Sequence, residues 1–188
     1  MAVHIPAIMM EIDDDYDLYN DMYGEELYKT NNTNMETTSI ERIKLLHPKI
    51  VDEALKAYTE AVNATPVNIH PFITEGLRSF KESDALYQQG RTKPGQIVTD
   101  APGGTSFHNY GLAIDFVIQE NWHSRWDVNK NWMTVVNIFK NYGWEWGGDW
   151  VHIIDRPHLQ KTFGYTYRQL LEKHNNKDFI SGTSFLNL

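Results

Sequence analysis

Cysteine is absent from all 188 residues of the sequence. This absence excludes disulfide bonds, thiolate nucleophiles and zinc sites built on cysteine sulfur. Any metal ion that the chain binds must therefore be held by histidine and carboxylate side chains, which are the other common zinc ligands in proteins. The sequence holds eight histidines and 25 aspartate and glutamate residues, so such ligands are available.

Long apolar runs and basic stretches are missing as well. No segment reaches the roughly 18 consecutive apolar residues that indicate a transmembrane helix. The N-terminus has neither the basic region nor the long apolar region of a secretory signal peptide, so we expect a protein made in the cytoplasm without a membrane segment. The formal net charge is −8 and Lys and Arg form no stripe. Because phosphates attract basic surfaces, no nucleic-acid partner is expected.

The length and composition suit one folded domain with a flanking segment at each end. Residues 1–37 are acidic, rich in tyrosine and asparagine, and without periodicity, so we expect a loosely ordered N-terminal extension. The acidic run at 13–17 also suggests a calcium site. It lacks the glycine and the distal glutamate of an EF-hand loop, so a solvated acidic run is the favoured interpretation. The folded domain is expected over 38–175, followed by a C-terminal tail over 176–188.

The first half of this domain shows helix signals and one strand signal. Thr38 and Glu41 have the spacing of a capping box, which predicts the start of a short helix. Pro48 marks a break or a new first turn, and apolar residues then recur at helical spacing over 51–62. The stretch PFITEG predicts a strand, and the helix after it is expected to begin near Ser79. Arg78 therefore lies at a strand-to-helix junction, where functional side chains are often displayed.

In the second half, GLAIDFVI predicts a strand in which Asp115 lies on one face. NWMTVVNIFKNYG predicts a helix with an apolar stripe, and Gly143 suits the position after its end. WEWGGDWVHIIDRPHLQ predicts a turn and a strand. Its three tryptophans, Trp144, Trp146 and Trp150, are candidate groove residues, and for two of the three a core position fits at least as well. GYTYRQLLEKH predicts a last short helix.

Two histidine–carboxylate pairs carry the functional signal. His108 and Asp115 lie seven residues apart at the edge of an apolar run, and Asp155 and His158 lie three apart in DRPH. Each pair alone is also consistent with a turn that enters a strand. A catalytic zinc site needs three protein ligands and a further carboxylate that takes a proton from water. The two pairs together supply side chains of these types for every role.

The other histidines are expected to be surface or hydrogen-bonded structural residues. His47 is expected at the surface or at a boundary near the helix break. His152 stays a candidate functional residue, because it is predicted on the strand that precedes Asp155 and His158. The six are His4, His47, His70, His123, His152 and His174.

The stretch SFHNYGLAIDF resembles the S-x-H-x-x-G-x-A-x-D signature of a family of zinc peptidases, the D-alanyl-D-alanine carboxypeptidases and L-alanyl-D-glutamate endopeptidases. ITEGLRSF, LYQQGRTKPGQIVT and WEWGGDWVHIIDRPHLQ also resemble this family, in particular its phage endolysin and bacterial autolysin branch. The resemblance covers about residues 39–165, and four stretches occur in the family's order. It implies an α+β fold, with a small antiparallel sheet flanked by helices and a zinc site at one end of the sheet.

The resemblance also implies a role for individual residues. By its pattern, the metal ligands are His108, Asp115 and His158, and the cofactor is Zn²⁺. Asp155 corresponds to the catalytic base, a position where the carboxypeptidases usually carry glutamate and the endopeptidases often aspartate.

Two further positions match residues that meet the substrate, and a third is a candidate from its residue type alone. Arg78 corresponds to an arginine that binds the substrate and stabilises the developing oxyanion, and Ser106 to a serine near the substrate backbone. Trp150 is a candidate substrate contact. Ser83 is a departure from the pattern, because many relatives carry glutamine there.

The implied activity is a zinc-dependent cleavage of the L-alanyl-D-glutamate bond in the peptidoglycan stem peptide, as in a phage endolysin. The protein is expected to act as a monomer on the cell wall, in the periplasm after release, and to be made in the host cytoplasm if phage-encoded. Two alternatives stay open, a D-alanyl-D-alanine carboxypeptidase and a non-catalytic wall-binding or virion protein on the same fold.

Overall fold

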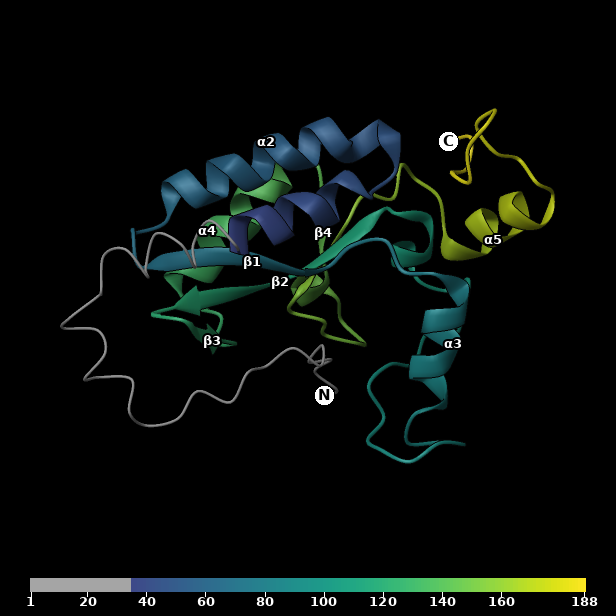
Figure 1. The fold of residues 1–188 in the computed structure, drawn as a ribbon, viewed down its shortest axis with the longest axis horizontal. Helices are drawn as coiled ribbons and strands as arrows, with labels where there is room; N and C mark the ends of the chain where they lie inside the picture. The colour runs from purple at the N-terminus through teal and green to yellow at the C-terminus, as the bar shows by residue number, and fades with distance from the viewer. Residues whose placement is uncertain (1–34) are drawn as a thin grey trace.

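The structure, a computed structural model, describes residues 35–188 (Figure 1). The expected N-terminal extension therefore lies almost wholly outside the described residues. The acidic run considered as a calcium site lies outside them as well. The first helix occupies residues 35–44 of the described chain, and it already includes residues 35–37. The helix start predicted at Thr38 is therefore wrong, and the division of the chain at residue 37 stays a prediction.

The described chain continues with helices and strands in mixed order. The helices are α2 (Pro48–Ala64), α3 (Phe80–Gln88), α4 (Lys130–Asn141) and α5 (Tyr167–Asn175). The strands are β1 (Ile69–Glu75), β2 (Ala113–Glu120), β3 (His123–Arg125), β4 (Glu145–Trp146) and β5 (His158–Gln160). Two short 3₁₀ helices, η1 (Phe107–Tyr110) and η2 (Gly147–Asp149), precede β2 and follow β4.

The strands form one antiparallel sheet around β2 (Figure 1). On one side β2 pairs with β1 along its length. On the other side its first residues pair with β5 and its last residues with β3, and β4 pairs with β5. The expected fold, a small antiparallel sheet with helices around it, is confirmed.

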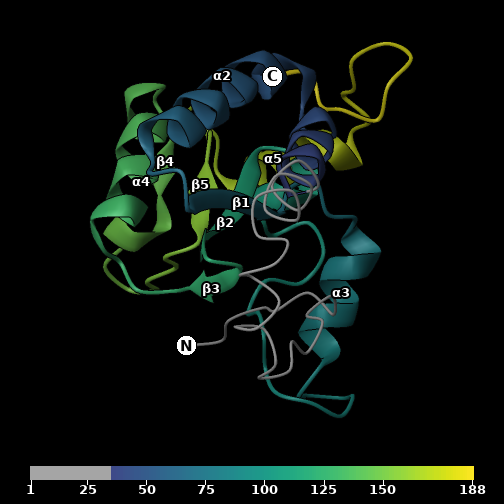
Figure 2. The same ribbon diagram turned by 60° about the vertical axis from the view of Figure 1, so that its left-hand side comes forward.

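Helices pack against the sheet, and β2 and β5 are buried on both faces, whereas β3 is mostly exposed. α2 runs along β1 and packs on both β1 and α4 (Figure 1). α3 stands on the opposite side of the molecule from α4, with the sheet between them (Figure 2). Burial of both faces explains why β2 reads as a nearly continuous apolar run, AIDFVIQE, in which Asp115 and the last residues are the polar exceptions.

Local sequence signals explain most helix boundaries. Pro48 occupies the first turn of α2, where a missing N–H costs nothing. Ser79 caps α3 in a reciprocal capping box with Glu82, so the helix begins where it was predicted to begin. Gly143 follows α4 with a φ of 78°, the left-handed conformation typical of a helix end. The predicted stripe on α4 is buried in the core, since Trp132, Val135, Val136 and Phe139 are each 0% exposed.

Two predictions about histidines are wrong. His47 is only 1% exposed, because its Nδ1 accepts the first-turn N–H of Lys49 while its Nε2 bonds to the carbonyl oxygen of Leu186 at 2.8 Å. It joins the start of α2 to the C-terminal segment. His152 lies in an exposed bend and not on a strand, since β5 begins only at His158.

Within residues 35–188, no helix combines the length and the apolar character needed to cross a bilayer.

Candidate active site

The candidate site lies where β2, β5 and η1 meet. Asp115 on β2 is the direct register partner of His158 on β5, so the antiparallel pairing puts the two side chains side by side. His108 lies in η1, which leads into β2 through Gly111. In this way the tertiary fold joins two histidine–carboxylate pairs that lie 40 or more positions apart in the sequence.

Three donor atoms form a nearly equilateral triangle. His108 Nε2 lies 3.2 Å from Asp115 Oδ1 and 3.1 Å from His158 Nδ1. The third side, from His158 Nδ1 to Asp115 Oδ1, is 3.1 Å. Among the described residues, His108, Asp115 and His158 form the one group of three or more such side chains that could hold a metal ion.

The chemistry of this triangle fits a zinc ion. Tetrahedral zinc with ligands at 2.0–2.1 Å requires donor atoms about 3.3 Å apart. The observed distances are close to this value, and two imidazoles with one carboxylate are a donor set that zinc takes in catalytic sites. The two imidazoles are buried, whereas the Asp115 side chain keeps 21% of its surface exposed.

The second nitrogen of each imidazole is already engaged. His108 Nδ1 lies 2.8 Å from the carbonyl oxygen of Gly76, and His158 Nε2 lies 3.0 Å from Oε1 of Gln160. A carbonyl oxygen only accepts, so each of these nitrogens carries the proton. The opposite nitrogens, which face the triangle, then carry lone pairs, as ligation requires.

Burial and charges within the site shift the pKa values of Asp115 and Asp155 in opposite directions. Burial raises the pKa of Asp115, but the neighbouring His108 and His158 outweigh it and hold that pKa well below its ordinary value. The pKa of Asp155 is raised, first by burial and then by the negative charge of Asp115. A carboxyl that stays ionised suits a ligand, and one with a raised pKa suits a group that takes up a proton.

Asp155 is held at the edge of the site by the backbone of Gly147. The N–H of Asp155 donates to the Gly147 carbonyl at 3.0 Å, and Asp155 accepts a weaker 3.4 Å bond from the N–H of His158. A side chain at Gly147 would approach the Asp155 carbonyl oxygen to 2.3 Å, so this contact requires glycine. Asp155 is not a member of the metal-binding group, yet it lies within reach of the charges of Asp115, His158 and Arg78.

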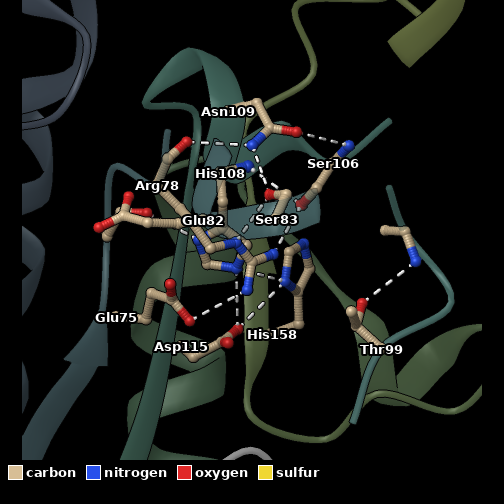
Figure 3. A network of polar contacts seen from close by, with 12 residues as sticks. Glu75, Arg78, Glu82, Ser83, Thr99, Ser106, His108, Asn109, Asp115 and His158 are labelled. Atoms are coloured by element: carbon tan, nitrogen blue, oxygen red, sulfur yellow. Dashed lines mark hydrogen bonds and ion pairs between the residues drawn. The ribbon is translucent and has the colours of Figure 1, made fainter. Parts of the chain in front are cut away.

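Arg78 lies beside the triangle and is fixed by three side chains (Figure 3). Its Nε donates to Ser83 Oγ at 3.1 Å, one terminal nitrogen to Glu75 at 3.2 Å, and the other to Ser106 Oγ at 3.5 Å. Three of its five N–H groups thus have partners in the described structure, which leaves two for a ligand. Its side chain is buried, and its backbone N–H donates to the His108 carbonyl.

Ser106 and Trp150 flank the same centre. Ser106 caps η1 by accepting the N–H of His108, and its hydroxyl also accepts from Arg78, so it joins the two residues. Trp150 is half-buried, with its ring centroid 5.3 Å from that of His158. Trp144 and Trp146 are buried in the core, as expected for two of the three tryptophans.

Several polar residues that support the site were not singled out from the sequence as functional. Asn109 Nδ2 donates to the Arg78 carbonyl and to Ser83 Oγ, while its Oδ1 accepts the N–H of Ser106 (Figure 3). The same Oδ1 also accepts the N–H of Gly104. Gln160 contacts His158, and Glu145 contacts Gln160. A polar residue inside an apolar stretch, as in FHNYGLAI, is the signal that could have found Asn109. Glu145 gives no comparable signal.

These features define a class: a hydrolase-like metal site with two imidazoles, one carboxylate ligand, a second carboxylate with a raised pKa and an arginine beside it. Comparison with known proteins agrees with this class. The family described as D-alanyl-D-alanine carboxypeptidase, peptidase M15, matches residues 99–161.

Two relatives extend the match beyond this segment. The chain is 50% identical over 126 residues to the peptidoglycan L-alanyl-D-glutamate endopeptidase CwlK of Bacillus subtilis strain 168, which covers 61% of this chain and 72% of CwlK. It is 34% identical over 100 residues to the L-alanyl-D-glutamate peptidase of Listeria phage A118, covering 47% of this chain and 36% of the phage protein. The solved L-Ala D-Glu endopeptidase ChiX of Serratia marcescens has a TM-score of 0.48, at 24% identity, over 67% of this chain and 87% of ChiX.

The chain belongs to the peptidase M15 family of metal-dependent peptidases, as its sequence motifs predicted.

Proposed function

We propose that this protein is a zinc-dependent peptidoglycan peptidase that hydrolyses the L-alanyl-D-glutamate bond of the stem peptide. The observation that carries the proposal is the triangle of donor atoms from His108, Asp115 and His158, with edges of 3.1–3.2 Å. The substrate is inferred from the relative that is 50% identical, whose name states this bond. The relative from a Listeria phage supports a role as a phage endolysin.

His108, Asp115 and His158 would hold the ion through Nε2, Oδ1 and Nδ1. When bound, zinc supplies Lewis-acid polarisation of a carbonyl group and makes water more acidic. The carboxylate of Asp115 would bring one negative charge to the ion, and the imidazoles that would hold it are themselves buried.

Asp155 is the general base in this proposal. It accepts the proton of the attacking water on its carboxylate and later delivers it to the nitrogen of the departing D-glutamate. Two observations support the role: Asp155 lies outside the metal-binding group, and burial and Asp115 raise its pKa above the ordinary aspartate value. A base with a raised pKa holds the transferred proton more firmly.

Arg78, Ser106 and Trp150 are proposed to bind the substrate. The two unpartnered N–H groups of Arg78 would donate to the carbonyl oxygen of the scissile bond, where negative charge develops. Ser106 offers a hydroxyl beside Arg78, and Trp150 offers a ring face next to His158. The arginine is held on three sides, so it needs little reorganisation when the substrate arrives.

The cell wall is accordingly the proposed place of action. A monomer suffices in this proposal, because all the residues that it uses come from one chain. The carboxypeptidase alternative remains an outcome of the test, because the matched family carries that description.

The test is digestion of purified peptidoglycan with and without a chelator, followed by mass spectrometry of the products. Fragments that end in a free L-alanine carboxylate, lost with chelator and restored by zinc, are expected. Released D-alanine would instead assign a carboxypeptidase. No cleavage by a protein with zinc confirmed bound would support the non-catalytic alternative.

A further inference from the structure

Gln160 and His158 lie on the same face of β5, because successive side chains on a strand alternate between faces. Gln160 is 7% exposed, and its Oε1 lies 3.0 Å from His158 Nε2. The contact is therefore a buried hydrogen bond on the side of the imidazole that faces away from the metal-binding triangle.

Glu145 completes a chain of contacts behind the ligand. It is the register partner of Gln160 across the β4–β5 pair, and its Oε2 accepts a hydrogen bond from Gln160 Nε2 at 3.1 Å. Its other oxygen accepts the hydroxyl of Thr162 at 2.7 Å. Both carboxylate oxygens of Glu145 are thus engaged as acceptors.

The direction of this chain follows from the chemistry of its members. An ionised carboxylate only accepts, so the Gln160 group that faces Glu145 must be the amide nitrogen. The amide oxygen then faces His158, and an oxygen requires that His158 Nε2 carry the proton. A flipped amide would set two oxygens against each other at Glu145 and would direct an N–H at His158 Nε2. The proton of His158 would then lie on Nδ1, the atom that belongs to the triangle.

We propose that Glu145 and Gln160 together position the metal ligand His158, by fixing its Nε2–H tautomer and the orientation of its ring. Gln160 is a positioning residue, and Glu145 acts through it. The inference rests on the proposed function, since it assigns a metal to the triangle. It identifies a carboxylate, two side chains away from the ion, whose charge decides which imidazole nitrogen is free to ligate.

The first variant is Gln160→Leu, which keeps the size of the side chain and removes its acceptor and donor. Zinc affinity, measured by competition with a chelating dye, should fall 10- to 100-fold, the usual cost of removing such a partner. Gln119→Leu is the matched control, because Gln119 is a buried glutamine of the same sheet whose amide bonds to Ser124 and not to the site. Its zinc affinity should stay that of the wild-type protein.

The second variant separates positioning from packing. Glu145→Gln combined with Gln160→Glu exchanges the two groups, so that residue 160 still accepts from His158 and residue 145 now donates. Zinc affinity should recover to within a few-fold of wild type. Glu145→Leu should weaken zinc binding less than Gln160→Leu, and adding it to Gln160→Leu should cause no further loss, since Glu145 acts through Gln160.

The tautomer can be observed without metal or turnover. In the metal-free protein at alkaline pH, nitrogen-15 NMR of the imidazoles should show the His158 proton on Nε2. In Gln160→Leu the signal should shift toward a mixture of the two tautomers. A merely structural role for Gln160 would leave the tautomer unchanged.

The outcomes distinguish this inference from the proposed function. If the wild-type protein binds no zinc or leaves peptidoglycan intact, the proposed function fails and the inference fails with it. If the wild-type protein binds zinc and cleaves, but Gln160→Leu keeps wild-type zinc affinity and the same tautomer, the inference alone is overturned. A loss of affinity in Gln160→Leu that the exchanged pair restores supports both.

Discussion

The side-chain amide of Asn109 donates a hydrogen bond to Ser83 Oγ at 2.7 Å, across 26 positions of the sequence. The same hydroxyl oxygen accepts the Nε–H of Arg78 at 3.1 Å. The contact joins η1, which carries the proposed ligand His108, to α3, which follows the proposed substrate-binding Arg78. Ser83 thus holds two donors with one buried oxygen.

Replacing Ser83 with alanine should misplace Arg78, because two buried donors lose their acceptor together. The expected result is a fall in kcat/KM of about 10- to 100-fold, since small errors in the position of a catalytic group are costly. Steady-state kinetics on a synthetic stem peptide would measure it. Ser124→Ala, at a serine that pairs with Gln119 away from the site, is the control. Wild-type kcat/KM in Ser83→Ala would show that Arg78 needs no such support.

Removing the Asp155 carboxylate should separate metal binding from turnover. Asp155→Ala is expected to keep its zinc content but to lose activity by about 10²- to 10⁴-fold, the usual contribution of a general base. His108→Ala should lose both, because it removes a corner of the donor triangle. Metal analysis and kinetics on the same samples would measure the two effects.

Asp149 provides a control carboxylate six positions away. It is exposed and pairs with Lys140, so Asp149→Ala should keep both zinc and activity. Near-normal turnover in Asp155→Ala would remove Asp155 from the mechanism and leave the identity of the base open.

His47 should make the stability of the metal-free protein depend on pH. Burial lowers the pKa of His47 below 6.5, an effect that the Leu186 carbonyl partly offsets. The unfolded chain then takes up a proton at a higher pH than the folded protein does. The stabilisation is present above about pH 6.5 and is lost as the pH falls toward the lowered folded-state pKa. Urea unfolding of wild type and His47→Asn on either side of this range would measure it.

In His47→Asn the stability should vary less with pH over the same range, because asparagine caps a helix without titrating there. Exposed His152 is the control site, and His152→Asn should follow the wild-type profile. An identical pH profile in all three proteins would mean that His47 does not carry the effect.

Gly111 should be irreplaceable for two separable reasons. It has a φ of 67°, and a side chain there would lie 2.8 Å from the backbone nitrogen of His47. Gly111→Ala is expected to lower the free energy of unfolding by about 1–3 kcal/mol, as strain of this kind does. Gly182 has a similar φ of 75° with nothing within 4 Å, so Gly182→Ala measures the conformational cost alone.

Denaturant unfolding of the two alanine variants would therefore isolate the steric part as their difference. Equal losses in both would mean that the contact with His47 relaxes without cost. A larger loss at Gly111 is expected, because its neighbour there is backbone and not a flexible side chain.

Much of the fold could be predicted from local sequence. Periodicity and caps located β1, α3 and α4, because hydrophobic spacing and capping act within one or two turns of the chain. Prediction failed where partners are distant. His47 is buried by Leu186, which lies 139 positions away, and no local pattern reports such a contact. The helix over 35–44 begins before the cap expected at Thr38, and the bend at His152 contradicts a strand expected from its apolar neighbours.

By itself, the sequence determined the kind of chemistry. A chain without cysteine and with two histidine–carboxylate pairs indicated a metal site, and the resemblance to the peptidase family implied His108, Asp115 and His158 as its ligands. Only the tertiary structure decided how those atoms meet. The register of β2 against β5 brings Asp115 and His158 together, and Gln160 and Glu145 become a support behind them because β4 pairs with β5. Strand register depends on packing across the whole sheet, so the arrangement around the metal-binding residues cannot be derived from their spacing alone.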